Sequence, residues 1–217
     1  FIKEVEYSEE ALNQLWIEFI KYRIIYDFEY WAYSFIFIKD KVSPKDIPFK
    51  LNRAQRRVLN KLEKLRKAGK PIKFILLKAR QWGGSTLVQI YMLWIMLVHR
   101  RNWNTVICGD VETQSRNVRA MITKALNKYP SYLLGETVKF TPFEGSSKNK
   151  VIQNTNCVVS IGSFQKPDTL RSGDISGAHL TEIGLWRATP GKKPEDLIQS
   201  ISGSIYDTAY TILGLES

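Results

Sequence analysis

The sequence predicts an α/β fold, in which a mainly parallel sheet is covered by helices on both faces and follows a helical N-terminal segment. Short apolar runs alternate with segments of helical periodicity from residue 72 to residue 215, a pattern typical of parallel strands joined by crossover helices. Apolar residues make up 44% of the 217 residues, which is enough for one sizeable core. We therefore divide the chain into a helical or lid segment with a linker, residues 1–48, and a core, residues 49–217.

The first segment is helical in pattern and rich in aromatic residues up to about residue 38. Ser8 precedes two glutamates and is a suitable N-terminal cap. The aromatic rings between residues 22 and 35 are able to stack on nucleic-acid bases, but such rings more often belong to a core or a docking face. Pro44 and Pro48 then indicate a linker.

A second helix is expected from Asn52 to Ala68, because Asn52 and Gln55 have the spacing of a capping box. The basic residues are concentrated here. Residues 50–80 carry a net charge of +11, which equals the net charge of the whole chain. Such a patch favours a polyanionic partner, either nucleic acid or nucleotide phosphate, and a solvated helix face without a partner is the alternative.

The remaining elements follow in order along the chain. Strands are expected at residues 72–77, 105–108, 157–161, 178–180 and 210–215, and helices from the glycine turn to about 98, at 113–128 and at 194–201. Residues 131–156 are polar and poorly periodic, so we expect a loop there. The two cysteines, Cys108 and Cys157, are too few for a disulfide framework and are expected as buried thiols.

No membrane partner is expected. The apolar stretches at residues 30–38 and 87–98 are shorter than the span of about 20 residues that a transmembrane helix needs. The N-terminus shows no basic region followed by an apolar run, so we expect no targeting signal and a cytoplasmic location.

The segment FILLKARQWGGST, residues 74–86, predicts a phosphate-binding loop between a strand and a helix. A turn of this kind presents successive backbone N–H groups at a helix N-terminus, which matches the dense negative charge of a polyphosphate. Gly83 and Gly84 allow close approach of the backbone, and Ser85 is placed to give its hydroxyl to Mg²⁺. An ordinary strand, turn and helix with basic residues is the alternative.

The loop departs from the standard G-x-x-x-x-G-K-[ST] form. Gly84 stands where that form has lysine, and the cations are Lys78, at the start of the loop, and Arg80 within it. A short apolar strand later in the chain ends at Glu182, a carboxylate suited to polarising an attacking water. Thr181 takes the place of the aspartate that usually precedes this glutamate.

Four segments together resemble motifs of the large terminase subunits of tailed phages, ATPases that drive DNA into a preformed capsid. The segments are PFKLNRAQRRVL, KARQWGGST, TLRSGDISGAHLTEIGLW and YTILGLES. In order, they are similar to the family's adenine-side motif, its Walker A motif with an early lysine, its arginine–glycine element leading into Walker B, and its coupling motif. The resemblance spans residues 49–217.

This resemblance implies a P-loop NTPase fold of the ASCE type, with Mg²⁺ and ATP as cofactors. Glu182 would activate water, Ser85 would ligate Mg²⁺, and Arg171 matches the position of a trans-acting arginine finger, although an ordinary loop arginine is the alternative. Glu216 and Ser217 would couple hydrolysis to movement. The implied nucleotide-binding residues are Gln55, Lys78, Ala79, Arg80, Gln81, Trp82, Gly83, Gly84, Ser85 and Thr86.

The resemblance also implies partners and a location. The partners are double-stranded DNA, the portal protein, the small terminase subunit and further copies of the chain in a ring. The location is the host cell cytoplasm and, transiently, the portal vertex of the procapsid, but not the virion. The family's C-terminal nuclease domain is not expected in this chain.

Two other functions remain open from the sequence. A helicase-like DNA translocase would share the ATPase core. A non-catalytic nucleic-acid-binding module with a vestigial P-loop stays open because Gly84 replaces the usual lysine and Thr181 the usual aspartate. Strand separation would identify the first, and nucleotide binding without turnover would identify the second.

Overall fold

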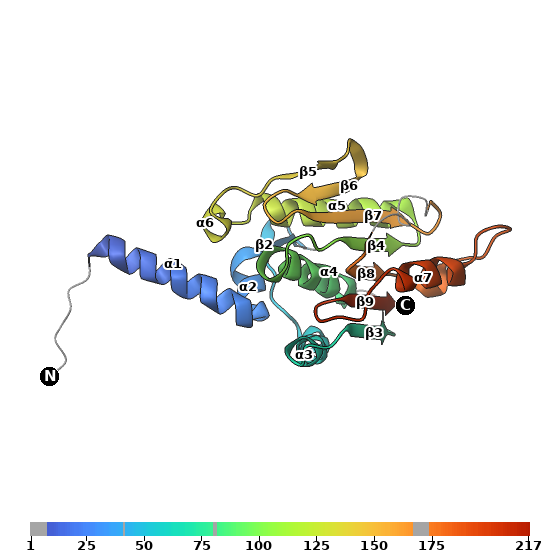
Figure 1. Ribbon diagram of the computed structural model, residues 1–217, viewed down its shortest axis with the longest axis horizontal. Coiled ribbons are helices and arrows are strands. Elements are labelled where there is room, and N and C mark those ends of the chain that lie inside the picture. The colour runs from blue at the N-terminus through green and yellow to red at the C-terminus, as the bar shows by residue number, and fades with distance from the viewer. Residues whose placement is uncertain (1–7, 41, 80–81, 167–173) are drawn as a thin grey trace.

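The structure is a computed structural model that describes residues 8–40, 42–79, 82–166 and 174–217. Its centre is a sheet of seven strands within these residues, in the order β3-β9-β8-β4-β7-β6-β5 (Figure 1). The strands from β3 to β7 are parallel, and β6 and β5 are added antiparallel. The predicted mainly parallel α/β fold is therefore confirmed. The strands are β3 (Ile72–Leu76), β9 (Ile212–Glu216), β8 (Gly177–Leu180), β4 (Thr105–Gly109), β7 (Cys157–Ser163), β6 (Ser146–Ile152) and β5 (Phe140–Phe143).

The order of the strands determines which loops meet at one edge of the sheet. β9 lies between β3, which precedes the glycine loop, and β8, which precedes Glu182. Because parallel strands have their carboxyl ends at one edge of the sheet, the segments that follow β3, β8, β9 and β4 meet there.

Helices cover both faces of the sheet, as predicted. On one face lie α3 (Arg53–Lys67), α4 (Gly84–Trp94) with its π-helical continuation η1 (Ile95–His99), and α5 (Glu112–Asn127). The side chains of Ile107 and Ile161 pack into this layer. On the other face, Val106 and Cys108 pack in a cluster with Leu197 of α7 (Pro194–Gly203). The alternating side chains of β4 thus contact two separate hydrophobic cores.

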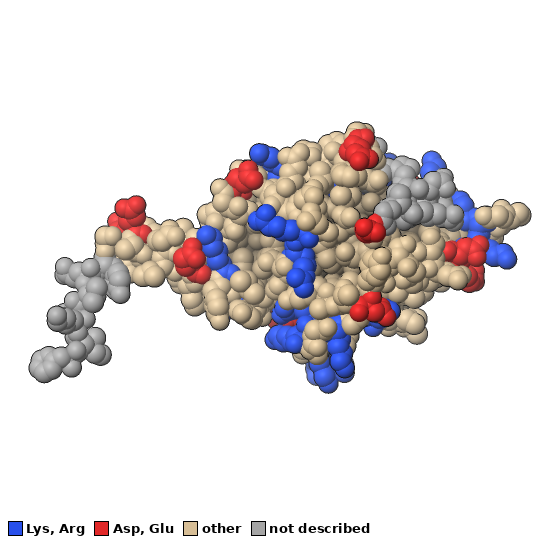
Figure 2. All heavy atoms as spheres, in the orientation of Figure 1, with Lys and Arg blue, Asp and Glu red and all other residues tan. Residues whose placement is uncertain are grey.

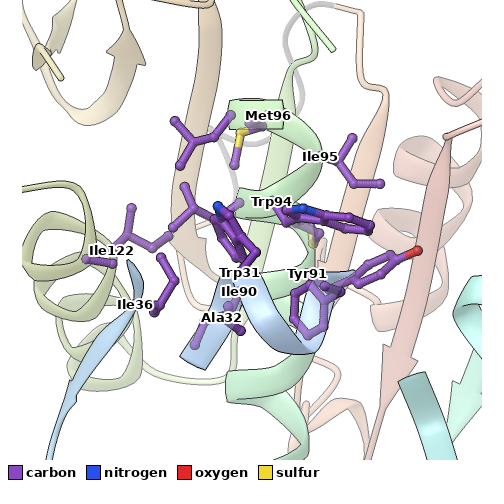
Figure 3. Close-up of a cluster of buried hydrophobic side chains, with 14 of the residues drawn as sticks. Trp31, Ala32, Ile36, Ile90, Tyr91, Trp94, Ile95, Met96 and Ile122 are labelled. Carbon is purple, nitrogen blue, oxygen red and sulfur yellow. The ribbon is translucent and has the colours of Figure 1, made fainter. Parts of the chain in front are cut away.

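The N-terminal segment forms two helices, α1 (Glu9–Tyr26) and α2 (Phe28–Phe35). The rings of α2 belong to the main core, where Trp31 lies beside Trp94 of α4 (Figure 3). The Trp31 indole N–H donates to the hydroxyl of Tyr129 over 2.9 Å. By contrast, α1 projects from the body (Figure 1) and leaves Trp16 and other large apolar side chains exposed. The domain boundary at residue 48 stays a prediction.

Two sequence-based expectations are wrong. The linker expected around Pro44 and Pro48 contains a strand, because β1 (Phe37–Lys39) pairs antiparallel with β2 (Asp46–Pro48). The loop expected at residues 131–156 contains α6 (Ser131–Leu134), β5 and β6. β5 is the edge strand of the sheet and β6 lies between it and β7. β6 carries the polar run SSKNK and so lacks the apolar pattern of the central strands.

Cys108 and Cys157 are free and buried, as expected. Burial, helped by the nearby Asp110, raises the pKa of the Cys108 thiol to about 12. Among the helices of the described ranges, none combines the length and the apolar character that crossing a membrane requires.

Candidate nucleotide site

The glycine loop is attached to the start of α3. Gly83 has a φ of +82°, a left-handed conformation that glycine adopts without a steric penalty, and it is the N-cap of α4. Gln55 donates from Nε2 to the carbonyl oxygen of Gly83, and Asn52 donates from Nδ2 to that of Trp82, each over 2.9 Å. No side chain of the described residues caps α4, so its first N–H groups are available to an anion.

Gln55 was predicted to lie near the adenine base. In the structure its side-chain amide makes two hydrogen bonds. Oε1 accepts from the backbone N–H of Asn52, and Nε2 donates to the carbonyl oxygen of Gly83. The predicted capping box at Asn52 is thereby confirmed. Gln55 also lines a hollow of about 280 Å³, together with Phe49, Trp82 and Thr86. This hollow adjoins the loop, and the role of Gln55 toward a base stays a prediction.

Position 84 has no room for a side chain. A Cβ atom there would lie 2.7 Å from the Trp82 ring and 3.1 Å from Cδ of Lys78. Trp82 therefore packs on the loop, and a lysine at position 84 would collide with its ring. The Lys78 side chain runs past Gly84 and is only 12% exposed. The Trp82 ring and the Lys78 side chain thus occupy the space beside Gly84.

Four side chains converge beneath the loop, where the carboxylate of Glu216 is fully buried. Its Oε1 atom lies 2.5 Å from Oγ of Ser85 and 3.0 Å from Nζ of Lys78. Its Oε2 atom lies 3.1 Å from Nε2 of the buried His179. Burial raises the pKa of Glu216, but the contacts with His179, Ser85 and Lys78 outweigh burial and hold that pKa below its usual value.

Neither Glu216 nor His179 was expected in this cluster. Glu216 was assigned to coupling by resemblance, and His179 was not assigned a role. The register brings Glu216 beside Leu76, the last residue of β3, and His179 beside Gly214. Both neighbours are remote in the chain, so no local pattern indicates the contact.

Glu182 stands at the end of β8, opposite the loop. Its φ of +56° is unusual for a residue with a side chain and stores strain at this position. Its carboxylate accepts a hydrogen bond from Nε2 of Gln114 on α5, and Oε1 of Gln114 accepts from the N–H of Asp110 over 3.0 Å. Gln114 is a site residue that sequence reasoning missed, because a glutamine inside a helix gives no motif signal.

Ser85, Thr86 and Glu182 line one pocket of about 220 Å³, with Gln114 and Thr181. The structure thus brings together the loop and the strand-end acid that the sequence predicted. A larger hollow of about 630 Å³ lies at the ends of β4 and β7, but no described residue of the glycine loop lines it. We therefore place the candidate site in the smaller pocket.

The other predicted site residues are distributed as follows. Ala79 is exposed at the start of the loop. Ser217 extends the pairing of β9 with β3, since its N–H donates to Leu76 and its carbonyl accepts from the N–H of Lys78. Arg80, Gln81 and Arg171 lie outside the described residues.

A metal ion at this site would depend on the nucleotide. Within the described ranges, no three His, Cys, Asp or Glu side chains are grouped as ligands for a metal ion. Mg²⁺ commonly binds through one or two protein oxygens together with substrate phosphates. The hydroxyl of Ser85, which lines the pocket, would be one such oxygen.

The chain is thus an α/β protein with a mainly parallel sheet and a glycine loop between a strand and a helix. Among solved structures, the chain is similar to the large terminase of bacteriophage HK97, with a TM-score of 0.66 and 21% identity over 91% of this chain and 37% of that one. It is also similar to a mutant ATPase domain of the large terminase of Thermus phage P74-26, with a TM-score of 0.50 and 12% identity over 77% of this chain and 64% of that one. The fold is therefore that of a phage large-terminase ATPase domain.

The comparison of sequences gives no match. No family model matches the chain, and no curated protein matches it either. The chain spans less than two thirds of the length of each of the two structures named above. The similarity of this chain to the two terminase structures therefore rests on the fold.

Proposed function

We propose that this chain hydrolyses ATP to power the movement of double-stranded DNA into a procapsid, as the motor domain of a large terminase. One observation carries the proposal: Ser85, at the glycine loop, and Glu182, at the end of β8, line the same pocket. Lys78 adds a cation beside Ser85, because both side chains contact the same oxygen of Glu216. The fold shared with two phage large terminases supports the motor role.

In this proposal the triphosphate binds at the uncapped start of α4, with Lys78 and Arg80 as the cations of the loop. The base occupies the hollow between Phe49 and Trp82. Ser85 would hold Mg²⁺, which when bound would supply positive charge to the phosphates.

The remaining steps belong to side chains around the pocket. Glu182 orients water for in-line attack on the γ-phosphate, and Gln114 fixes the position of its carboxylate. Arg171 of a neighbouring copy enters as an arginine finger, a group that contributes about 10³–10⁵ in rate in other NTPases. Glu216 and Ser217 contact the loop from the end of β9, and they couple hydrolysis at the loop to the movement of DNA.

The exposed face of α3 is the proposed DNA contact. Figure 2 shows Lys and Arg side chains gathered over the region where α3 lies in Figure 1. Part of this charge is used within the chain, since Arg56 pairs with Glu29 and Arg66 with Glu63. The exposed Lys and Arg residues of α3 without an ion pair inside the described ranges are Arg53, Arg57, Lys61 and Lys64. Contact with DNA phosphates would be sensitive to salt and indifferent to sequence.

The partners proposed with this function are the portal protein, the small terminase subunit and further copies of the chain in a ring. The proposed location is the host cell cytoplasm and the portal vertex. The test is Mg²⁺-dependent ATP turnover measured against protein concentration for the unaltered chain, Glu182→Gln and Arg171→Ala. A finger supplied in trans predicts that specific activity rises with concentration.

Glu182→Gln is expected to bind ATP but to lose about 10²–10⁴ in turnover, because it removes the base and keeps the shape. Glu195→Gln, an exposed acid on α7, is the matched control and should keep full turnover. Failure to bind ATP would rule out the function. Strand separation by an active protein would indicate a helicase instead, and binding without turnover at any concentration would favour a vestigial P-loop.

A further inference from the structure

The hollow between Phe49 and Trp82 adjoins the pocket that contains Ser85 and Glu182. Thr86, in the first turn of α4, lines both cavities. A nucleotide whose phosphates lie at the loop therefore has space for its base in this hollow, whose volume is about 280 Å³. That volume lies just below the range of about 300–1,000 Å³ that is usual for small-molecule sites, so it suits a single ring system.

One wall of the hollow comes from the β1–β2 pair. Ile38 and Ile47 are partners across this pair, so their side chains lie on the same face, and both line the hollow. Asp46, whose side chain takes the opposite face, makes ion pairs with Lys124 and Lys128 of α5 over 2.6 Å each. These ion pairs fix the β1–β2 pair against α5, so the apolar wall does not have to form when a ligand binds.

The two side-chain amides that line the hollow already bind the protein backbone. Asn52 accepts from the N–H of Gln55 and donates to the carbonyl oxygen of Trp82, while the Gln55 amide bonds to the backbone of Asn52 and Gly83. Turning either amide toward a base would break the cap of α3 and release the glycine loop. A cap and a single hydrogen bond to a base contribute similar amounts of free energy, so the exchange brings no gain.

The backbone along this wall offers few donors to a base. The N–H groups of Phe49 and Lys50 donate to backbone carbonyl oxygens over 2.8 Å and 2.9 Å, and Pro48 has no N–H. Three further polar groups belong to the described lining: the Lys50 ammonium, the Thr86 hydroxyl and the Trp82 indole N–H. The hydroxyl either donates or accepts, and the other two donate to an acceptor such as N7, which adenine and guanine share. None of the three selects one purine over the other.

Apolar packing is then the main contribution that the hollow makes to binding a base. Phe49 and Trp82 supply rings, which pack against every base because every base has a π-face. At the rim Ile47 is 39% exposed and Lys50 is exposed, so the hollow is open to water. Water satisfies the hydrogen-bonding edges of adenine and guanine alike. The affinity therefore depends on the area of the ring system and little on its identity.

We propose that this hollow holds a purine base by apolar packing without reading its hydrogen-bonding edge, so that the chain accepts ATP and GTP as one class of ligand. The inference rests on the proposed function and deepens it, because it states which nucleoside triphosphates the site takes. The phosphates place the ligand at the glycine loop, and the ring system adds affinity. Gln55 then acts on the nucleotide through the loop and not through the base.

The test is a competition titration in the presence of Mg²⁺, in which ATP, GTP and inorganic tripolyphosphate each displace a fluorescent ATP analogue from the unaltered chain. The dissociation constants of ATP and GTP should agree within about tenfold, whereas sites that read hydrogen bonds discriminate by about 10⁴–10⁵. Tripolyphosphate should bind at least about tenfold more weakly than ATP, because it has no ring to pack. A preference for ATP over GTP of more than about tenfold would overturn the inference and leave the nucleotide site intact.

Ile47→Ala tests the apolar wall. It should weaken ATP and GTP by the same factor, about threefold to tenfold, and leave tripolyphosphate unchanged. Val42→Ala is the matched control, because Val42 is 94% exposed and does not line the hollow. It should leave all three affinities unchanged. A loss confined to ATP in Ile47→Ala would contradict packing that is indifferent to the base.

Gln55→Ala separates support of the loop from recognition of the base. Since Gln55 holds Gly83, its loss should weaken ATP, GTP and tripolyphosphate by a common factor. A loss for ATP alone would show that Gln55 reads adenine and would overturn the inference. Tripolyphosphate binding as tightly as ATP to the unaltered chain would also overturn it, while the phosphate site would stand. If the unaltered chain binds none of the three ligands, the proposed function fails together with the inference.

Discussion

The side-chain amide of Gln55 donates to the carbonyl oxygen of Gly83 over 2.9 Å and so joins the first turn of α3 to the glycine loop. Asn52, one turn earlier, makes the parallel bond to Trp82. A shift of the basic helix therefore pulls on the backbone that would surround the phosphates. This gives a direct physical connection between the proposed DNA contact and the nucleotide site.

Replacing Gln55 with alanine should destabilise the chain and weaken nucleotide binding. Gln55 is 4% exposed, so its loss leaves the N–H of Asn52 and the carbonyl of Gly83 without their side-chain partner. The expected loss in the free energy of unfolding is about 1–3 kcal/mol. Urea unfolding and titration with an ATP analogue measure the two effects.

Asn60→Ala serves as the control, because Asn60 is exposed on the same helix and its side chain makes no hydrogen bond within the described residues. It should leave nucleotide affinity unchanged. If Gln55→Ala behaves like this control in both measurements, the bond to Gly83 contributes nothing to the loop.

Adding a single methyl group at Gly84 should disrupt the loop. Its carbon would lie 2.7 Å from the Trp82 ring, so either the ring or the backbone must move. The expected cost of Gly84→Ala is about 1–3 kcal/mol in the free energy of unfolding, with weaker nucleotide binding. Thermal unfolding measures the first effect and calorimetric titration the second.

Gly203→Ala is the matched control for this substitution, because nothing lies within 4 Å of its added carbon and its φ is not in the left-handed region. It should stabilise the chain by about 0.4–1 kcal/mol. The double variant Gly84→Ala with Trp82→Ala should recover part of the loss caused by Gly84→Ala. Simple additivity of the two substitutions would show that the ring is not the obstacle.

Acid should weaken the fold through His99 before the carboxylates are protonated. Burial, followed by the charge of Arg66, lowers the pKa of His99 from 6.5 to about 4, although Glu63 opposes this. Between these values the unfolded chain binds more protons than the folded chain. Stability is therefore present above pH 6.5 and declines as the pH falls towards about 4.

The variant His99→Phe, which keeps a ring against Trp94, should remove this decline. The measurement is the free energy of unfolding in urea at about pH 7 and about pH 5, for the unaltered chain and the variant. A decline of the same size in both chains would assign the acid sensitivity to other groups. A rise in stability on acidification would contradict a lowered pKa for His99.

The elements with local signals were predictable from the sequence. The capping box at Asn52, the strand before the glycine loop and the alternation of strands and helices all depend on residues close together in the chain. The strands β5 and β6 were missed because β6 carries the polar run SSKNK and lacks the apolar period of the central strands. The β1–β2 pair was missed because two prolines suggested irregular backbone.

The candidate site was predictable only in part. Lys78, Ser85 and Glu182 follow from motif spacing, and the structure brings them to one edge of the sheet. The contacts of Glu216 and Gln114 depend on how β9 and α5 lie against the loop and β8, which neither residue type nor spacing reveals. Long-range pairing of strands is the information that single-sequence reasoning lacks.

The position of β9 has a consequence for how the molecule folds. This strand pairs on one side with residues 72–76 and on the other with residues 177–180, yet it is synthesised after both. Until residues 212–216 emerge from the ribosome, β3 lacks its partner strand and the sheet has a gap between β3 and β8. Closing such distant parallel pairs is slow, because the entropy of a long loop is lost before the contacts form. Nascent chains that end before residue 212 should therefore be the ones that chaperones retain.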